Sequence, residues 1–553
     1  MNMSKKIYEK FAAAVALASL VVLGGCLDLE ESIVSGVTSS FYQTPAGFEA
    51  AVNAAYSGLH DQYAQERTMT MEELGTDIWV KGSDGSHKQW NDYTPALNAS
   101  TAYATQLWDL SYRAINTANA VISRAEGLTG VSESHKLLRV AEVRFLRALY
   151  YFNLVRHYGD VHITLEETTG VVTEASRRPV EEVYNQVIIP DLEFAAANLP
   201  VKQSDYGRAT KGAAHSLLSM VYLTRGAAGD MERALDFADR VIDSGEYDLL
   251  SNFGDLFTMG NEKNSEVIFS VQFTNDPLTT GGGNRWHLYF LMEYDREPGM
   301  TRTTEYGRPF KRLRPTEHLL YLWDRETDVR YEQSFQHVWF VNAPDPNRGL
   351  AMGDTSIYLP AVRTSELPEE YKSKNYRVFT EPDDYWNPSP QLWGAEYDYR
   401  YYPTLLKHLD PTRNSINEER GQRDFVVFRL AGIYLMAAEA LVRAGRPAEA
   451  VPYLNTVRRR AARPGFENEM DITAADVDLD FVMDERAREL AGEGGRWFDL
   501  TRQGADYFVE RVRQYNLDAA AVQEFHALRP IPQTQIDRTK NADGTDFGQN
   551  PGY

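Results

Sequence analysis

The chain contains a single cysteine in 553 residues, and this one thiol limits how the fold can be stabilised. A disulfide needs two thiols, so no disulfide framework is available to the chain. If Cys26 is used elsewhere, no cysteine remains to bind a metal either. The composition, with 43% hydrophobic and 12% aromatic residues, is typical of a globular protein with a large core. Stability must therefore come from packing and from helix chemistry.

The position of Cys26 predicts that it is a site of lipid attachment. Three lysines stand within the first ten residues, apolar or small residues fill positions 11–23, and Gly24 and Gly25 precede the cysteine. This is the order of a secretory signal, and the apolar run is shorter than the roughly 20 residues that a membrane-spanning helix needs. Leu23-Gly24-Gly25-Cys26 also resembles the processing box of bacterial lipoproteins. The alternative is a chance cysteine behind an ordinary signal peptide.

The charge balance excludes one class of partner. The chain carries 57 Lys and Arg residues against 79 Asp and Glu residues, a net charge of −22. Such a surplus of negative charge opposes binding to nucleic acid and to anionic lipid surfaces. We therefore expect no nucleic-acid partner, and contact with a membrane only through the lipid anchor.

Helical periodicity is the main structural signal in the chain. Apolar residues recur at spacings of three and four between Leu138 and Val155, which predicts one long amphipathic helix ended by Gly159. Residues 213–245 and 429–462 each read as two helices joined by a glycine-containing turn, with small alanines at the contacts. These are features of tetratricopeptide-like helix pairs, although the pairs are not in tandem.

Residues 246–422 differ from this pattern. They are rich in glycine, proline and aromatic residues and predict long loops and short strands laid on the helical scaffold. The predicted organisation is a signal peptide, a lipidated tether, an N-terminal helical region, and a C-terminal region packed with it as one globular unit. Their ranges are 1–25, 26–44, 45–245 and 246–553.

Several catalytic and metal-binding patterns fail on inspection. The run 281–285 lacks the Gly-Lys-Ser/Thr ending of a phosphate-binding loop. Asp476, Asp478 and Asp480 resemble the start of a calcium loop, but its turn glycine and final acid are missing, so they are expected at a helix start instead. His157 and His162 do not share a helical face. We expect no cofactor, no metal site and no enzymatic activity. A pair of carboxylates for glycoside hydrolysis stays as an alternative among so many acids.

Four blocks of sequence together resemble the SusD/RagB family of outer-membrane nutrient-uptake lipoproteins. They occur in order and extend over nearly the whole chain after the signal peptide. The blocks are Ala141–Phe152 with Tyr158-Gly159-Asp160; Phe428–Ala431 with Tyr434–Ala440; Glu485–Leu490 with Glu493–Leu500; and Pro530-Ile531-Pro532 with Gln549–Tyr553.

The resemblance implies a mainly α fold with four tetratricopeptide-like helix pairs, a loop-rich face and a few short strands. It implies a lipoprotein on the outer membrane, facing the exterior, that binds a glycan or another nutrient. Its partner would be a TonB-dependent transporter of the SusC type, and Asp28, Glu30 and Glu31 would fit an export signal. The alternatives are a tetratricopeptide-type adaptor for proteins or, less favoured, a hydrolase.

Most residues of the four blocks have a structural interpretation. Five charged residues should form ion pairs that tie the last helices together, and Gly494 and Gly495 should allow a tight reversal. Trp108 and Trp497 are expected in the core. The five charged residues are Glu485, Arg486, Arg488, Arg496 and Asp499.

A sugar-binding face needs exposed aromatic rings beside polar side chains, so we looked for aromatic residues in polar, glycine-rich loops. Two loops qualify, 79–93 and 284–289, and Trp339, Trp386 and Trp393 rank below them. The alternative for each tryptophan is packing under its own loop or against the transporter. If the assignment holds, alanine at Trp90 and Trp286 weakens glycan binding without unfolding the chain. The predicted ligand contacts are Trp79, Trp90, Asn91, Tyr93, Arg285, Trp286 and Tyr289.

Overall fold

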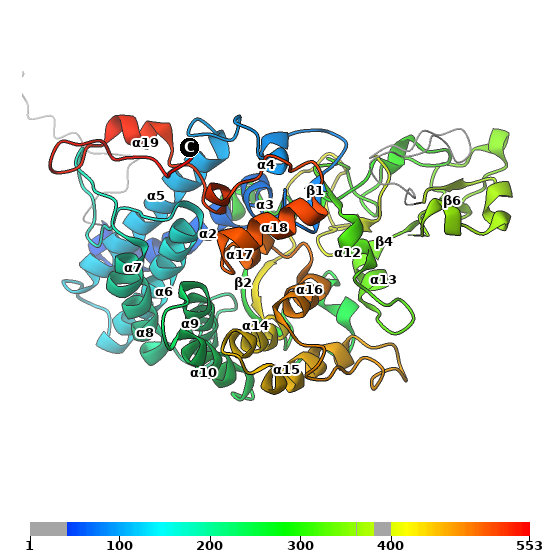
Figure 1. Ribbon diagram of the computed structural model, residues 1–553. Coiled ribbons are helices and arrows are strands. Elements are labelled where there is room, and N and C mark those ends of the chain that lie inside the picture. The colour runs from blue at the N-terminus through cyan, green and yellow to red at the C-terminus, as the bar shows by residue number, and fades with distance from the viewer. Residues whose placement is uncertain (1–40, 361, 381–399) are drawn as a thin grey trace, which may run out of the picture.

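A computed structural model describes residues 41–360, 362–380 and 400–553 (Figure 1). Cys26, the acidic tether up to residue 40, Trp386 and Trp393 lie outside these described residues. Lipid attachment at Cys26 therefore stays a prediction.

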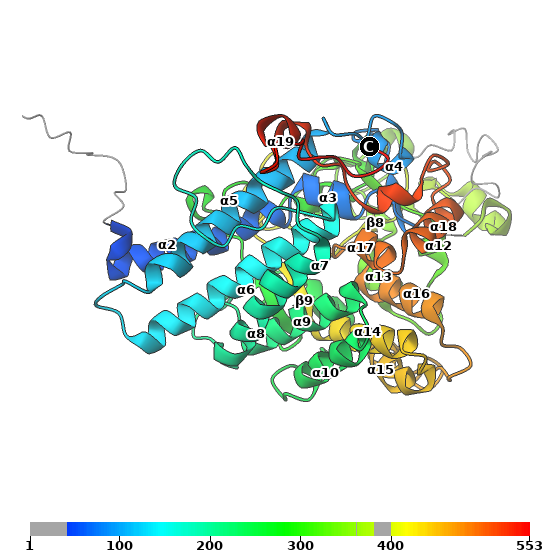
Figure 2. The same ribbon diagram turned by 60° about the vertical axis from the view of Figure 1, so that its left-hand side comes forward.

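The long helices form four neighbouring pairs, α2 with α5, α6 with α8, α9 with α10, and α14 with α15. Adjacent pairs also pack on each other, so the helices form a continuous row that can be followed in Figure 2. The predicted fold class, mainly helical with few short strands, is confirmed. The paired helices are α2 (Pro45–Gln62), α5 (Ala102–Ala125), α6 (Glu133–Tyr158), α8 (Ile189–Asn198), α9 (Lys211–Arg225), α10 (Asp230–Ile242), α14 (Leu430–Arg443) and α15 (Pro447–Arg460).

Helix α6 shows why the sequence folds this way. It begins after Ser132, whose hydroxyl accepts a hydrogen bond from the backbone N–H of His135 at 3.3 Å, and it ends at Gly159. Its second half is buried on nearly every side, because α5 and α8 cover it from two directions. The helix predicted from the apolar stripe is confirmed and extends a turn further at its N-terminal end.

The two predicted helical hairpins are also confirmed as α9–α10 and α14–α15. The apolar stripes of these helices predict which residues point inward, and all of those residues except Phe237 are buried. They are Leu217, Val221, Ala234, Ala238, Val241, Ile433, Ala437, Ala440, Leu441, Ala450, Leu454 and Val457. Phe237 is only partly buried and instead stacks on the ring of Tyr222, with ring centroids 5.8 Å apart. Asp478 caps the start of α16, where its carboxylate accepts from the N–H of Phe481 at 2.8 Å, as its position before a helix predicts.

The remaining α-helices lie outside these four pairs. They are α3 (Glu66–Glu72), α4 (Lys88–Asp92), α7 (Val180–Val183), α11 (Pro277–Thr280), α12 (Glu317–Tyr321), α13 (Arg330–Ser334), α16 (Leu479–Leu490), α17 (Arg496–Thr501), α18 (Ala505–Tyr515) and α19 (Gln533–Arg538).

The strands are short and pair mostly across long stretches of sequence. Strand β1 pairs antiparallel with β3, β2 with β9, and β4 with β8, while β5, β6 and β7 form a three-stranded sheet. Figure 1 shows this sheet at the side of the molecule away from α2 and α8. The strands are β1 (Trp79–Lys81), β2 (Val267–Val271), β3 (Leu313–Pro315), β4 (Phe335–Gln336), β5 (Val338–Phe340), β6 (Thr355–Tyr358), β7 (Arg377–Val378), β8 (Thr404–Leu405) and β9 (Phe425–Arg429).

A buried charge cluster joins these elements. The carboxylate of Glu489 in α16 accepts from Arg429 at 2.6 Å, from Arg330 at 3.0 Å and also from Arg460. These arginines come from the end of β9, the start of α13 and the end of α15. Burial alone would raise the pKa of Glu489, but the three guanidinium groups outweigh it and hold that pKa far below its usual value. The cluster comprises Glu266, Arg330, Arg429, Arg460, Glu485, Glu489 and Glu493.

The ion pairs expected in the last helices are mostly confirmed. Arg486 binds Asp499 at 2.8 Å, and Arg488 binds Glu485 at 2.8 Å. Arg496 differs, because its partner is Asp77, close to β1, at 2.6 Å. It therefore ties the last helices to the chain before β1. It also ties them to one another, because its Nη1 donates to Met483 O in α16 at 2.8 Å.

Two further expectations concern local packing. Gly494 and Gly495 have φ values of +100° and +88°, which fits the predicted reversal between α16 and α17. Trp108 and Trp497 are 2% and 0% exposed and lie in the core, as expected.

We predict that Glu489→Gln lowers the free energy of unfolding by about 3–5 kcal/mol, because three buried arginines lose their shared carboxylate. Chemical denaturation would measure the change. Glu449→Gln is the matched control, since Glu449 pairs with Arg446 on the surface, and its midpoint should stay at the wild-type value. Equal midpoints for the two variants would contradict a structural role of the cluster.

Candidate functional site

The two loops predicted to bind ligand meet on one face of the molecule. The N–H of Gly82 donates to Arg312 O at 2.8 Å, and the N–H of Arg312 donates to Tyr289 O at 3.0 Å. The chain after β1 and the turn at 284–289 are thus joined through the segment before β3. A third loop closes the arrangement, because Asn284 and Gly421 exchange backbone hydrogen bonds of 3.0 and 2.8 Å.

The expectation that the chosen aromatic residues form exposed platforms is wrong. Six of the seven predicted contacts are at most 1% exposed, and Arg285 alone reaches the surface. The lower-ranked Trp339 is buried as well. The six buried residues are Trp79, Trp90, Asn91, Tyr93, Trp286 and Tyr289.

The rings are buried because residues remote in sequence pack over them. Trp286 lies edge-on to Phe425 with centroids 4.9 Å apart, and its indole N–H donates to Gln65 O at 3.0 Å. Trp79 lies edge-on to Phe290 at 4.9 Å. These indoles therefore support the loops from beneath.

The polar members of the first loop have structural partners too. Asn91 accepts from the N–H of Lys81 at 2.9 Å, and the hydroxyl of Tyr93 donates to Gly75 O at 2.8 Å. Arg529 lies over the ring of Trp90 at 5.0 Å. Of the seven predicted ligand contacts, Arg285 is the one whose side chain reaches the surface, so it stays a predicted contact.

A different set of partly exposed side chains lies beside these loops, and we call it the loop-face cluster. Tyr103 and His87 lie ring against ring at 4.6 Å, and the hydroxyl of Tyr103 is 3.1 Å from His87 Nε2. His87 Nε2 is 3.3 Å from Glu66, which also binds Arg312 at 2.5 Å. The members of the cluster are Glu66, His87, Tyr103, Arg285, Arg308, Phe310, Arg312 and Glu419.

The other half of the loop-face cluster surrounds Phe310. Arg308 and Arg312 lie 5.2 and 5.5 Å from the centre of its ring, in cation–π contact. Glu419 binds Arg308 at 3.2 Å and also binds Arg285. The ring of Phe310 thus lies between two guanidinium groups, and glutamate carboxylates balance their positive charges.

Buried polar atoms without a partner lie next to this surface. Among the described residues, nothing hydrogen-bonds the hydroxyl of Tyr289 or the Nε of Arg285. Burial raises the pKa of Tyr289 well above its usual value, so its hydroxyl keeps its proton. Such atoms need a partner, which a water or a ligand hydroxyl could supply.

The arrangement suits recognition of hydroxyl-rich molecules. Aromatic faces contact apolar C–H surfaces, and guanidinium and carboxylate groups bind hydroxyls. One segment of the sequence indicates this surface, but the prediction did not include it. The segment 307–312 places Phe310 between Arg308 and Arg312 behind a glycine, which satisfies the rule applied to the other two loops.

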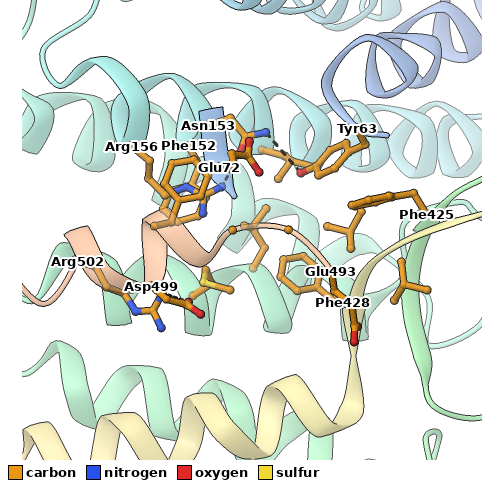
Figure 3. Close-up of a pocket in the computed structure, with 18 of the residues that line it drawn as sticks. Tyr63, Glu72, Phe152, Asn153, Arg156, Phe425, Phe428, Glu493, Asp499 and Arg502 are labelled. Carbon is orange, nitrogen blue, oxygen red and sulfur yellow. Dashed lines mark hydrogen bonds and ion pairs between the residues drawn. The ribbon is translucent and has the colours of Figure 1, made fainter. Parts of the chain in front are cut away.

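A cavity lies inside the molecule, between α6, α9, β9 and the turn before α17 (Figure 3). It has a volume of about 90 Å³. Glu72, Arg156 and Phe152 line one side, and Tyr63 and Phe425 lie further along (Figure 3). A groove of about 760 Å³ borders this cavity at the C-terminal end of α6.

The electrostatics of this cavity are unusual at Glu72. No described side chain hydrogen-bonds its carboxylate, and Nε2 of His157 lies 3.7 Å away. Burial lowers the pKa of His157 well below its usual value, so this ring is neutral. Burial raises the pKa of Glu72 to about 7, against the smaller opposing effects of Arg156 and Arg529. Glu72 therefore changes charge near neutral pH.

Two features are absent from the residues that the structure describes. None of their helices is long and apolar enough to cross a membrane. No group of three or more of their His, Cys, Asp or Glu side chains is placed to hold a metal ion.

The fold and this face define a class of helical-repeat proteins that present one loop-built surface. Comparison with protein families identifies the class. The family described as SusD matches residues 265–553, and the family described as "Starch-binding associating with outer membrane" matches residues 27–223. The protein belongs to the SusD family.

Individual relatives extend over nearly the whole chain. SusD-like protein P2 of Formosa agariphila is 28% identical, covering 97% of this chain and 98% of its own. Starch-binding protein SusD of Bacteroides thetaiotaomicron is 24% identical, covering 96% and 93%. The structure is similar to that of a laminarin binding SusD-like protein, with a TM-score of 0.69 and 25% identity over 93% of this chain and 100% of that one.

We predict that Trp286→Ala lowers the free energy of unfolding by about 3–5 kcal/mol, because it leaves a cavity under the loop. Urea denaturation would measure the loss. Phe340→Ala is the control, because Phe340 is 49% exposed and its loss should cost less than about 1 kcal/mol. A Trp286 variant as stable as the control would contradict the buried position of the ring.

We predict that Glu72→Gln stabilises the protein at pH 8 and not at pH 4.5. The folded-state pKa is raised, so this carboxyl favours folding below its unfolded pKa of 4.5 and loses that contribution as the pH rises through about 7. The difference between the two pKa values corresponds to roughly 3 kcal/mol at high pH. Denaturation of both proteins across this pH range tests it, with the exposed Glu193→Gln as control. A gain independent of pH would contradict the assignment.

Proposed function

We propose that the protein is a cell-surface lipoprotein that binds a glycan through the loop-face cluster. Cys26 would carry the lipid and hold the protein on the outer membrane, facing the exterior. The bound glycan, or another nutrient, would pass to a TonB-dependent transporter of the SusC type. In this role the protein binds its ligand without chemical change.

The observation that carries the proposal is the loop-face cluster itself. Two partly exposed aromatic residues, Tyr103 at the start of α5 and Phe310 in the segment before β3, stand among three arginines on loops that buried tryptophans support from beneath. Rigid loops hold such side chains in place before the ligand arrives, which reduces the entropy lost on binding.

The relatives guide the choice of ligand. One similar structure is that of a laminarin binding protein, and one relative is named a starch-binding protein. A β-glucan such as laminarin and an α-glucan such as starch are therefore the first two glycans to test.

The test is isothermal titration of the full-length protein with a panel that includes laminarin and starch. We predict that the double variant Tyr103→Ala/Phe310→Ala weakens binding of the preferred glycan about 10- to 100-fold, because two stacking contacts of roughly 1 kcal/mol or more each are lost. Phe466→Ala is the control, since Phe466 is 40% exposed in the turn after α15.

Other outcomes would favour the remaining hypotheses. Affinity unchanged in the double variant would contradict the site. Shorter sugars appearing during prolonged incubation would indicate a hydrolase. Affinity for peptides with none for any glycan would indicate a tetratricopeptide-type adaptor.

A further inference from the structure

The internal cavity of Figure 3 and the groove at the C-terminal end of α6 are neighbours. Arg156, Phe498 and Arg502 line both spaces and form the wall between them. By volume, the cavity holds roughly six to nine water molecules, which is comparable to one sugar ring with its substituents.

Arg156 stands at this boundary in an unusual setting. Its guanidinium lies between the rings of Phe152 and Phe498, 4.1 and 3.7 Å from their centres. One Nη donates to Asn153 at 2.5 Å, while its buried Nε has no partner among the described residues. No described carboxylate oxygen lies within 4.0 Å of it. The rings hold the cation flat and leave one edge free.

The other arginines of the cavity have their charges matched. Arg502 binds both Glu439, at 2.5 Å, and Asp499, and Arg486 binds Asp499 at 2.8 Å. Burial lowers the pKa of Arg156, and the carboxylate of Glu72, which lies beyond ion-pairing distance, offsets that effect only in part. A carboxylate from outside would offset the cost of burial with a two-point hydrogen bond.

The groove contains a second arginine, Arg177, that has no ion-pair partner in the described part of the chain. Arg177 donates to Asp160 O at 2.9 Å and to the side chain of Asn550, and it too lacks a carboxylate within 4.0 Å among the described residues. Arg225, by contrast, is bound by Asp230 at 2.7 Å. Two guanidinium groups that have no described carboxylate within 4.0 Å make this groove a local exception in a protein of net charge −22.

Other residues that line the cavity are suited to hydroxyl groups. Glu72 has no hydrogen-bond partner among the described side chains, and Tyr63 accepts only a long bond of 3.4 Å from Asn153. Aromatic rings of Phe152 and Phe425 supply apolar contacts (Figure 3). A carboxylate alone would leave these groups unused.

We propose that this cavity is a second binding site, separate from the loop-face cluster, for a hydroxylated carboxylate the size of one sugar unit. The ligand enters through the groove past Arg177. Its carboxylate binds the free edge of Arg156, and its hydroxyls reach Glu72 and Tyr63.

The test compares glucuronate with glucose on the full-length protein by isothermal titration. The two probes share their ring hydroxyls and differ in the carboxylate. Glucuronate should bind at least about tenfold more tightly than glucose, and Arg156→Gln should remove that difference. Arg178→Gln, at an exposed arginine next to Arg177, is the matched control and should bind as wild type does.

Two further measurements keep the result clear. The double variant Tyr103→Ala/Phe310→Ala should bind glucuronate normally, which separates this site from the proposed glycan site. If Arg156→Gln does not fold, wild-type protein can be treated with phenylglyoxal, and glucuronate should protect the peptide carrying Arg156 from modification. Absence of binding up to about 10 mM, equal binding of glucose, or no protection would overturn the proposal.

Discussion

The packing of the C-terminal half depends on one set of interactions, the ion pairs that the carboxylate of Glu489 makes with three arginines. Three guanidinium groups converge on this carboxylate from β9, α13 and α15, elements that are far apart in the sequence. Buried charges are costly to remove from water, so such a cluster is stable only when every member has its partners. The cluster therefore fixes not only that these elements pack but how they are oriented.

This fixed frame extends to the loop face through a chain of ion pairs. Arg496 follows directly on the Gly494–Gly495 reversal and binds Asp77, which lies just before β1. Arg511 of α18 binds the same carboxylate at 3.0 Å. The strand that leads into the first site loop is thus held by the last helices of the chain. Loops anchored in this way can present side chains rigidly, although they contain little regular structure.

The sequence was informative where structure follows from local periodicity. The stripe from Leu138 to Val155 determines α6 because a helical face needs only its own residues to be recognised. Of the charged residues expected to pair in the last helices, Arg486 and Arg488 do so, but Arg496 pairs with Asp77, a contact that no local pattern indicates. The site was not predictable, because whether a ring in a glycine-rich loop is exposed depends on remote residues. Trp286 is buried by Phe425 and Gln65, and no local pattern encodes that contact.

The two candidate sites differ in how their arginines are neutralised, and that difference determines which ligands each favours. In the loop-face cluster, Glu419 and Glu66 match the arginines around Phe310, so the surface offers oriented donors with little net charge. Neutral hydroxyls suit it, and an anion would have to displace an acid. At Arg156 no acid occupies the free edge of the guanidinium, so a neutral ligand would leave the charge uncompensated. A strongly acidic protein repels anions at long range, but screening confines that repulsion to about 8 Å at physiological salt. A cation enclosed by two aromatic rings can therefore select an anion that the rest of the surface would reject.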